Sequence, residues 1–321
     1  MKNKKTVTLS LLLLLLLFSV VIGIISGPVK IPLSELFSVW NSEIVGLRIT
    51  RVLLGLVAGA GLAVAGVIFQ GILRNPLAEP YVLGVSSGAG LGAVLALFFN
   101  ISAEFLPLTS FLGAALTMFL VYNLARIDGR VSAHGLLLSG VIIGAIFSSL
   151  LLFFVSISPN EAMHSITWWL LGSLQVFDLK LLSLATVIII AGILVAVYLG
   201  RDLNAISLGE EEAYHLGINV ESVKEILFIV ASLITGSVVC ICGIIGFVGL
   251  IVPHAVRLIC GSDHKFVLPA SAISAGAFLI LSDAISRTVM PPVEVPIGVI
   301  TALIGGPVFV FLLRKRQKVP F

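Results

Sequence analysis

The chain has 321 residues, of which 59% are apolar and only 11% are charged, and its formal net charge at pH 7 is +3. Soluble domains contain about 45–50% apolar and about 25% charged residues, so a soluble fold of this length could not bury this much apolar surface. The composition therefore excludes a soluble globular enzyme, a disordered protein and a nucleic-acid-binding protein, and it indicates a protein surrounded by lipid.

The N-terminal segment combines basic residues with a long apolar run. Lys2, Lys4 and Lys5 precede an apolar stretch over residues 7–25. That stretch is longer than the roughly 7–15 apolar residues of a signal peptide, and no small-residue cleavage motif follows it. We therefore expect a retained membrane-spanning helix here.

Charge-free segments along the chain predict the remaining spans. Nine long segments lack Asp, Glu, Lys and Arg, and a membrane-spanning helix needs about 20 mostly apolar residues. The segment 226–256 is too long for one span and carries several glycines and Pro253, so we expect a break within it. The sequence predicts an all-α polytopic membrane protein, one domain over residues 1–321, with ten transmembrane helices. The expected spans are 7–26, 51–73, 81–99, 106–125, 134–156, 181–200, 224–242, 246–259, 266–286 and 295–313.

The distribution of basic residues predicts the orientation. Ten spans keep both termini on one side of the membrane. The segments on that side contain 14 Lys and Arg residues, whereas the segments on the other side contain 5. Because basic residues favour the cytoplasmic side, both termini are expected to be cytoplasmic.

The chain has no energy source of its own in its sequence. It contains no G-x-x-x-x-G-K-[ST] motif for ATP phosphates, and Asp283 is the nearest candidate for an ion relay within the spans. Cys240, Cys242 and Cys260 have neither a disulfide nor a zinc-site pattern, so we expect small buried side chains. We expect no metal and no cofactor, and a transporter of this kind must take its energy from a partner.

The longest cytoplasmic loop, residues 201–225, is net acidic, although such loops usually favour Lys and Arg. Within it, residues 207–217 place Leu208, Tyr214 and Leu216 among acidic residues at helical spacing. This pattern favours a short amphipathic helix outside the membrane that docks on another protein. A solvated acidic loop is the alternative interpretation.

Several motifs of five or more residues occur in a fixed order along the chain. They are RNPLAEP at 74–80, LGVSSGAG at 83–90, GFVGLIVPH at 246–254, EVPIGV at 294–299 and GGPVF at 305–309. With them the chain closely resembles the permease subunits of type II ABC importers for iron–siderophores, haem and cobalamin, from about residue 46 to residue 314.

The resemblance implies a multi-pass protein of the bacterial cytoplasmic membrane that pairs with a second permease copy, most simply as a homodimer. It further implies two ATP-binding cassette ATPase subunits below and an extracytoplasmic substrate-binding protein above, with the lipid bilayer around. The expected function is ATP-driven import of an iron chelate, a ferric siderophore by the breadth of the family, or of haem or cobalamin. The alternative is a gradient-driven secondary carrier.

The resemblance also assigns roles to individual residues. The ATPase-coupling residues it implies are Leu208, Gly209, Glu210, Ala213, Leu216 and Gly217. Arg48, Arg51 and Arg287 are expected to dock the binding protein, since fixed positive charges steer and orient an acidic partner. The alternative is that they extend to lipid headgroups.

The translocation pathway and its gate are assigned on the same basis. The cytoplasmic gate is expected at the turn 131–135, where Ala133 and His134 replace the small hydroxyl residues that are usual in the family. Trp168 and Trp169 are expected on a short outer helix near the pathway, or as interfacial anchors. The pathway and gate residues are Ser86, Ser87, Ser132, Ala133, His134, Trp168 and Trp169.

Overall fold

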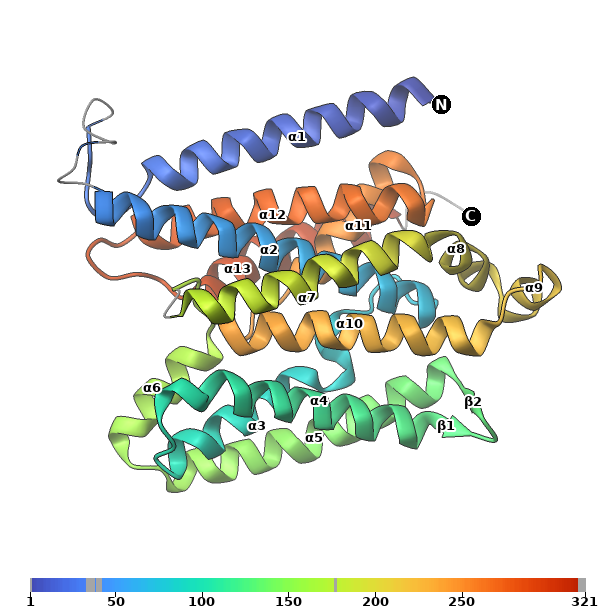
Figure 1. Ribbon diagram of the computed structural model, residues 1–321, viewed down its shortest axis with the longest axis horizontal. Coiled ribbons are helices and arrows are strands. Elements are labelled where there is room, and N and C mark those ends of the chain that lie inside the picture. Colours follow the sequence, from blue (N-terminus) through green and yellow to red (C-terminus); the bar gives the residue numbers. More distant parts are fainter. Residues whose placement is uncertain (1, 33–37, 39–41, 176–177, 317–321) are drawn as a thin grey trace.

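The computed structural model describes residues 2–32, 38, 42–175 and 178–316, and most of its helices run along one long axis (Figure 1). The α-helices are α1 (Lys2–Ile25), α2 (Ser42–Ile72), α3 (Val85–Phe98), α4 (Leu106–Ala125), α5 (Ala133–Ile157), α6 (Asn160–Leu170), α7 (Leu179–Tyr198), α8 (Gly200–Leu208), α9 (Glu210–His215), α10 (Val220–Cys242), α11 (Val248–Cys260), α12 (His264–Thr288) and α13 (Ile297–Arg316). The remaining elements are the 3-10 helices η3 (Pro80–Leu83) and η4 (Ala103–Phe105) and the strands β1 (Arg126–Ile127) and β2 (Arg130–Val131).

Seven of the described helices are long and apolar enough to cross a bilayer. They are α1 from Lys5, α2, α4, α5, α7, α10 and α12, whereas α3, α11 and α13 are shorter apolar helices. Each of the ten segments expected to span the membrane overlaps one of these helices. The chain is thus a nearly all-helical, multi-span membrane protein, while the count of ten crossings and the cytoplasmic position of both termini stay predictions.

One predicted helix boundary agrees with the structure and another differs from it. The break in the long charge-free segment lies at residues 243–247, between the end of α10 and the start of α11. In contrast, α2 begins at Ser42, nine residues before the expected start of the second span. The expected start lies at Arg51 because charged residues are expected to end a span, but the protein itself accommodates Arg48 and Arg51 inside the helix.

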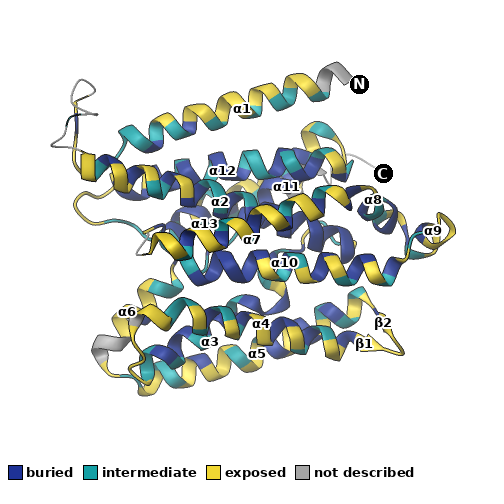
Figure 2. Cartoon of the chain, viewed as in Figure 1, coloured by how far each residue is buried: buried dark blue, intermediate teal, exposed yellow. Residues whose placement is uncertain are grey.

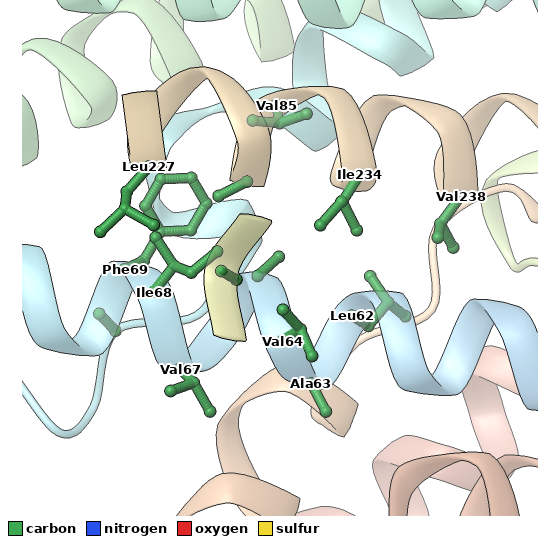
Figure 3. Close-up of a cluster of buried hydrophobic side chains, with 14 of the residues drawn as sticks. Leu62, Ala63, Val64, Val67, Ile68, Phe69, Val85, Leu227, Ile234 and Val238 are labelled. Carbon is green, nitrogen blue, oxygen red and sulfur yellow. The ribbon is translucent and has the colours of Figure 1, made fainter. Parts of the chain in front are cut away.

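The core of the bundle is built around α2. This helix contacts α7, α10, α11 and α12. In its apolar 18-residue stretch 78% of the residues are buried, compared with 11% in the corresponding stretch of α1, which lies at the edge (Figures 1 and 2). On the other side of α10, α3, α4 and α5 pack against one another. In Figure 3, apolar side chains of α2, such as Leu62 and Phe69, face Leu227, Ile234 and Val238 of α10.

Close backbone contact, rather than large side chains, joins α2 to α11. A Cβ atom on Gly66 would lie 1.9 Å from the carbonyl oxygen of Gly249, so only glycine fits at position 66. Lipid tails are as apolar as the helix surfaces, so helices in a membrane associate through such close packing. The glycine-rich composition therefore places α11, which begins after a break in the chain, directly against the central helix.

Candidate coupling site and outer charge cluster

The segment 207–217 lies where α8 and α9 project beyond the end of the bundle (Figure 1). The sequence predicts one short helix there, whereas the structure has two helices that meet at Gly209. Ala213 is fully buried and packs into the main hydrophobic core. It therefore anchors α9 to the bundle.

The outer surface of this segment is apolar and acidic. Leu208, Tyr214 and Leu216 are 81%, 73% and 71% exposed, and Glu211 and Glu212 are exposed beside them. Outside the membrane-crossing helices, lipid does not cover large apolar side chains, so such a patch is typical of a protein-docking surface.

The segment ends in a turn that requires glycine. Gly217 has φ +79°, in the left-handed region, and its amide donates a hydrogen bond of 2.9 Å to the carbonyl of Tyr214. A side chain is disfavoured in this conformation, whereas glycine adopts it readily. Gly217 therefore fixes the path from α9 toward α10.

A cleft of about 840 Å³ separates this segment from the start of α5. Residues 208–212 line one wall, and Ser132, Ala133 and His134 line another. Ser132 is the N-cap of α5, since its Oγ accepts a hydrogen bond of 2.9 Å from the amide of Gly135. The structure thus brings the predicted gate turn and the predicted coupling segment to the same cleft.

Ser86 and Ser87 lie elsewhere, in the first turn of α3. The Ser87 hydroxyl is buried and donates a 2.8 Å hydrogen bond to the carbonyl of Gly84. Neither serine is among the described residues that line the 840 Å³ cleft. Their assignment to the pathway stays a prediction.

The three arginines assigned to docking lie near the opposite end of α2, with Arg48 and Arg51 on α2 and Arg287 on α12. Arg48 is only 3% exposed, and its guanidinium donates hydrogen bonds to the carbonyls of Ile24, Ile25 and Val29 at 3.1, 2.9 and 2.5 Å. The last carbonyls of a helix have no partner within the helix. Arg48 therefore closes the end of α1.

Arg51 and Arg287 share a carboxylate. Asp283, which is 1% exposed, lies 2.7 Å from Arg51 Nη2 and 2.9 Å from Arg287 Nε. Glu294 adds a second carboxylate at 2.9 Å from Arg51 Nη1. Arg287 also donates to the carbonyls of Gly23 and Ser26 at 3.0 and 2.9 Å.

These contacts change how the three arginines are described. The sequence interpretation treats them as fixed charges on the outer rim, but their side chains are engaged by carbonyls and carboxylates of the chain itself. The physical reason is that a charge near the apolar region is costly unless it is paired. Their role in docking stays a prediction.

The tryptophans of α6 line a cavity of about 460 Å³ beside this charge cluster. Trp168 and Trp169 share its wall with His164, Arg51 and Glu294. The aromatic pair and the paired charges therefore form one mixed apolar and charged surface. Its place on the translocation pathway stays a prediction.

The motifs that match the family meet inside the protein. The Glu79 carboxylate accepts a 2.5 Å hydrogen bond from the amide of Phe247. Gln70 donates to the carbonyls of Ala78 and Gly249 at 3.1 and 3.2 Å, and Arg257 contacts the Gln70 oxygen. Irregular backbone at membrane depth needs such internal partners, so the motif residues stabilise the break before α11.

The model of the FecCD transport family matches residues 12–315. The chain belongs to the FecCD transport family. Among its relatives is the cobalamin import system permease protein BtuC of Halobacterium salinarum, 41% identical over 272 residues, which are 84% of this chain and 73% of that protein. The hemin transport system permease protein HmuU of Yersinia pestis is 36% identical over 280 residues, 85% of this chain and 83% of that protein.

A solved structure agrees with this assignment. It is an inward-facing conformation assigned to the metal-chelate type of ABC transporter, and it is 34% identical to this chain. Its TM-score is 0.87, and the match covers 97% of this chain and 99% of the other. This FecCD family permease therefore shares its whole fold, and not only its motifs, with an ABC transporter.

Two carboxylates and one lysine of this permease were not assigned a site role from the sequence. Asp283 was considered only as an ion relay, Glu294 only as part of a motif, and Lys224 only as the start of a span. The signal that could have found them is charge itself, since an ionisable residue inside an apolar helix needs a partner on another helix. The partner's identity depends on packing, which the spacing of charges along one chain does not reveal.

Proposed function

We propose that this FecCD family permease is the membrane-spanning subunit of an ATP-driven importer that carries a ferric siderophore, or haem or cobalamin, into the cytoplasm. The observation that carries the proposal is the exposed apolar and acidic surface of residues 207–217, next to the cleft at the start of α5. That surface is where a separate motor protein would act on the transmembrane helices.

The energy comes from partner subunits in this proposal. The sequence has no phosphate-binding loop of its own. In this proposal two ATP-binding cassette ATPases hydrolyse ATP and contact α8 and α9. A second copy of the permease completes the pathway, and an extracytoplasmic binding protein delivers the substrate. The complex resides in the cytoplasmic membrane of a bacterial cell.

Transport then follows from movement at the inner cleft. Closure of the ATPases shifts α9 relative to the turn at Ser132, Ala133 and His134, and α5 tilts with that turn. The chelate passes along the axis of the dimer, beside Ser86, Ser87 and the α6 tryptophans. The binding protein presents acidic residues to Arg48, Arg51 and Arg287. For Arg51, a carboxylate of the binding protein then replaces one of the carboxylates of this chain with which it is paired.

The buried charges argue against the gradient-driven alternative. Asp283 is the candidate relay, but its two oxygens are engaged by Arg51 and Arg287 at 2.7 and 2.9 Å. Both oxygens of the candidate relay are therefore already occupied by guanidinium groups of the chain, and neither is open to a transported ion.

Replacement of Leu216 by Glu tests the proposal. We expect the variant to retain about one tenth or less of the ATPase that co-purifies with wild type, since a loss of about 1.4 kcal/mol of binding energy is tenfold. Uptake of a ferric siderophore by proteoliposomes should fall in parallel. Ile127→Glu is the matched control, because Ile127 is 70% exposed on β1, outside the coupling segment. Equal ATPase binding by both variants and wild type would contradict the coupling role of residues 207–217.

A further inference from the structure

Lys224 is a buried cation near the inner end of α10. The residue is 3% exposed, and its ammonium group has three acceptors. They are the carbonyl of Val131 at 2.5 Å, Glu221 Oε1 at 2.9 Å and Glu210 Oε2 at 3.1 Å. A buried ammonium with three hydrogen bonds uses its full donor capacity, so its position is fixed by all three partners.

Lys224 and Glu221 together hold Val131, in the segment that leads into α5. The Val131 carbonyl accepts from Lys224, while the Val131 amide donates a 3.0 Å hydrogen bond to Glu221 Oε2. Lys224 and Glu221 are themselves an ion pair on successive turns of α10. Both backbone groups of Val131 are therefore tied to α10, one residue before Ser132, the N-cap of α5.

The third partner belongs to the coupling segment. Glu210 is the first residue of α9, and its other carboxylate oxygen lies 3.9 Å from Arg74, which opens the 74–80 motif. The same ammonium that holds Val131 thus also holds α9. The cleft of about 840 Å³ separates α9 from residues 132–134, and Lys224 connects its two walls.

We propose that Lys224 is the positioning residue that transmits a displacement of α9 to the start of α5. When the ATPase moves α9, Glu210 moves with α9 and pulls the Lys224 ammonium through their ion pair. Lys224 and Glu221 then displace Val131, because both are hydrogen-bonded to its backbone. The ammonium has little access to water, so it follows its acceptors rather than exchanging them for solvent. This inference rests on the coupling role of residues 207–217 proposed above.

The test uses the full complex of permease and ATPase in proteoliposomes, with uptake and ATP hydrolysis measured together. Lys224→Gln keeps a polar side chain but removes the charge. We expect uptake per ATP hydrolysed to fall about tenfold, within the usual range of coupling between two sites, while the ATPase still binds. Lys224→Arg, which keeps the charge and several donors, should recover part of the loss.

Glu210→Gln is the second variant, because Glu210 is part-exposed and the change removes the charge that pairs with Lys224. It should lower uptake per ATP, and the double variant with Lys224→Gln should be no worse than Lys224→Gln alone, as expected for residues that act through one contact. Asp128→Asn is the matched control, since Asp128 is an exposed carboxylate in the turn between β1 and β2, outside the coupling segment, and asparagine also adopts its φ of +51°. Its ratio should equal that of wild type.

Two results would overturn the proposal. One is an unchanged ratio of uptake to hydrolysis in both Lys224→Gln and Glu210→Gln. The other is an additive loss in the double variant, which would mean that the two residues act separately. If wild type itself shows no ATP-dependent uptake, the proposed function fails instead, so the two failures are distinguishable.

Discussion

The two ends of this permease hold charges in opposite ways. At one end of the bundle, Arg48 and Arg51 of α2, Arg287 of α12 and two carboxylates form a cluster that joins α1, α2 and α12. At the end that carries α9, part-exposed acids surround one buried lysine beside an open cleft. The first arrangement locks helices together, whereas the second links elements that have room to move.

This difference indicates which parts of the permease move during transport. Buried charge pairs resist separation, because each partner would remain as an uncompensated charge. The α1, α2 and α12 group should therefore move as one rigid body. At the other end, the cleft leaves space between α9 and α5, so displacement there costs few packing contacts.

Loss of the shared carboxylate should break the rigid end. Asp283→Asn leaves Arg51 and Arg287 without their common counter-charge, and we expect a loss of about 3–5 kcal/mol of stability. Thermal unfolding of the detergent-solubilised protein measures the change. Glu294→Gln is the graded control, since among the described residues Glu294 forms an ion pair with one arginine, Arg51, and its side chain is 26% exposed. Its cost should be about 1.5–3 kcal/mol. A melting temperature for Asp283→Asn equal to that of wild type would remove the rigid-body argument.

Strain introduced into the left-handed turn after α9 tests whether the mobile end of the permease depends on the orientation of α9. Gly217→Ala places a side chain at φ +79°, which costs about 1–2 kcal/mol, although nothing lies within 4 Å of the added Cβ. We expect uptake to fall because the turn relaxes and reorients α9. Gly261→Ala also places a side chain at a disfavoured positive φ, +86° with ψ −177°, in open space, but lies outside the coupling segment. Equal uptake in the two variants would show that the orientation of α9 does not matter for transport.

The smallest effect concerns the ion pair between Lys5 of α1 and Asp263 at the start of α12, 2.8 Å apart and part-exposed. The hydrogen bond from Lys5 holds the pKa of Asp263 below its usual value of 3.8. Because the pKa of Asp263 is lower in the folded state, its stabilisation is fully present when the pH is above 3.8. The stabilisation is lost as the pH falls through the lowered folded-state pKa. Asp263→Asn, which retains the N-cap, should therefore flatten stability against pH in that acidic range, by less than about 1 kcal/mol. A wild-type profile identical to that of the variant would contradict the assignment.

Much of the fold could be predicted from the sequence because lipid imposes simple rules. Each segment expected to span the membrane overlaps a helix, and the glycine-rich break before α11 lies within the charge-free segment 226–256. The start of α2 was missed because the rule that charges end spans fails when Arg48 and Arg51 find partners inside the protein. Such partners come from distant parts of the chain, and their pairing depends on packing.

The candidate site was predictable to a similar degree. Residue patterns and resemblance predict a coupling segment at 207–217 and resemblance predicts a gate turn at 131–135; residues of both line one cleft, while their roles stay predictions. Their connection through Lys224 could not be predicted, because it requires Glu210, Glu221 and Val131 to meet from three different elements. The break at Gly209 was also missed, since helical spacing on both sides of a glycine resembles one continuous helix.

The most direct test of the account is uptake of a ferric siderophore by proteoliposomes that contain the permease, its ATPase and the binding protein. The account predicts uptake that requires ATP on the ATPase side and that persists when proton and sodium gradients are collapsed. It also predicts that uptake stops when the ATPase is omitted. Uptake by the permease alone that follows an ion gradient would contradict the account.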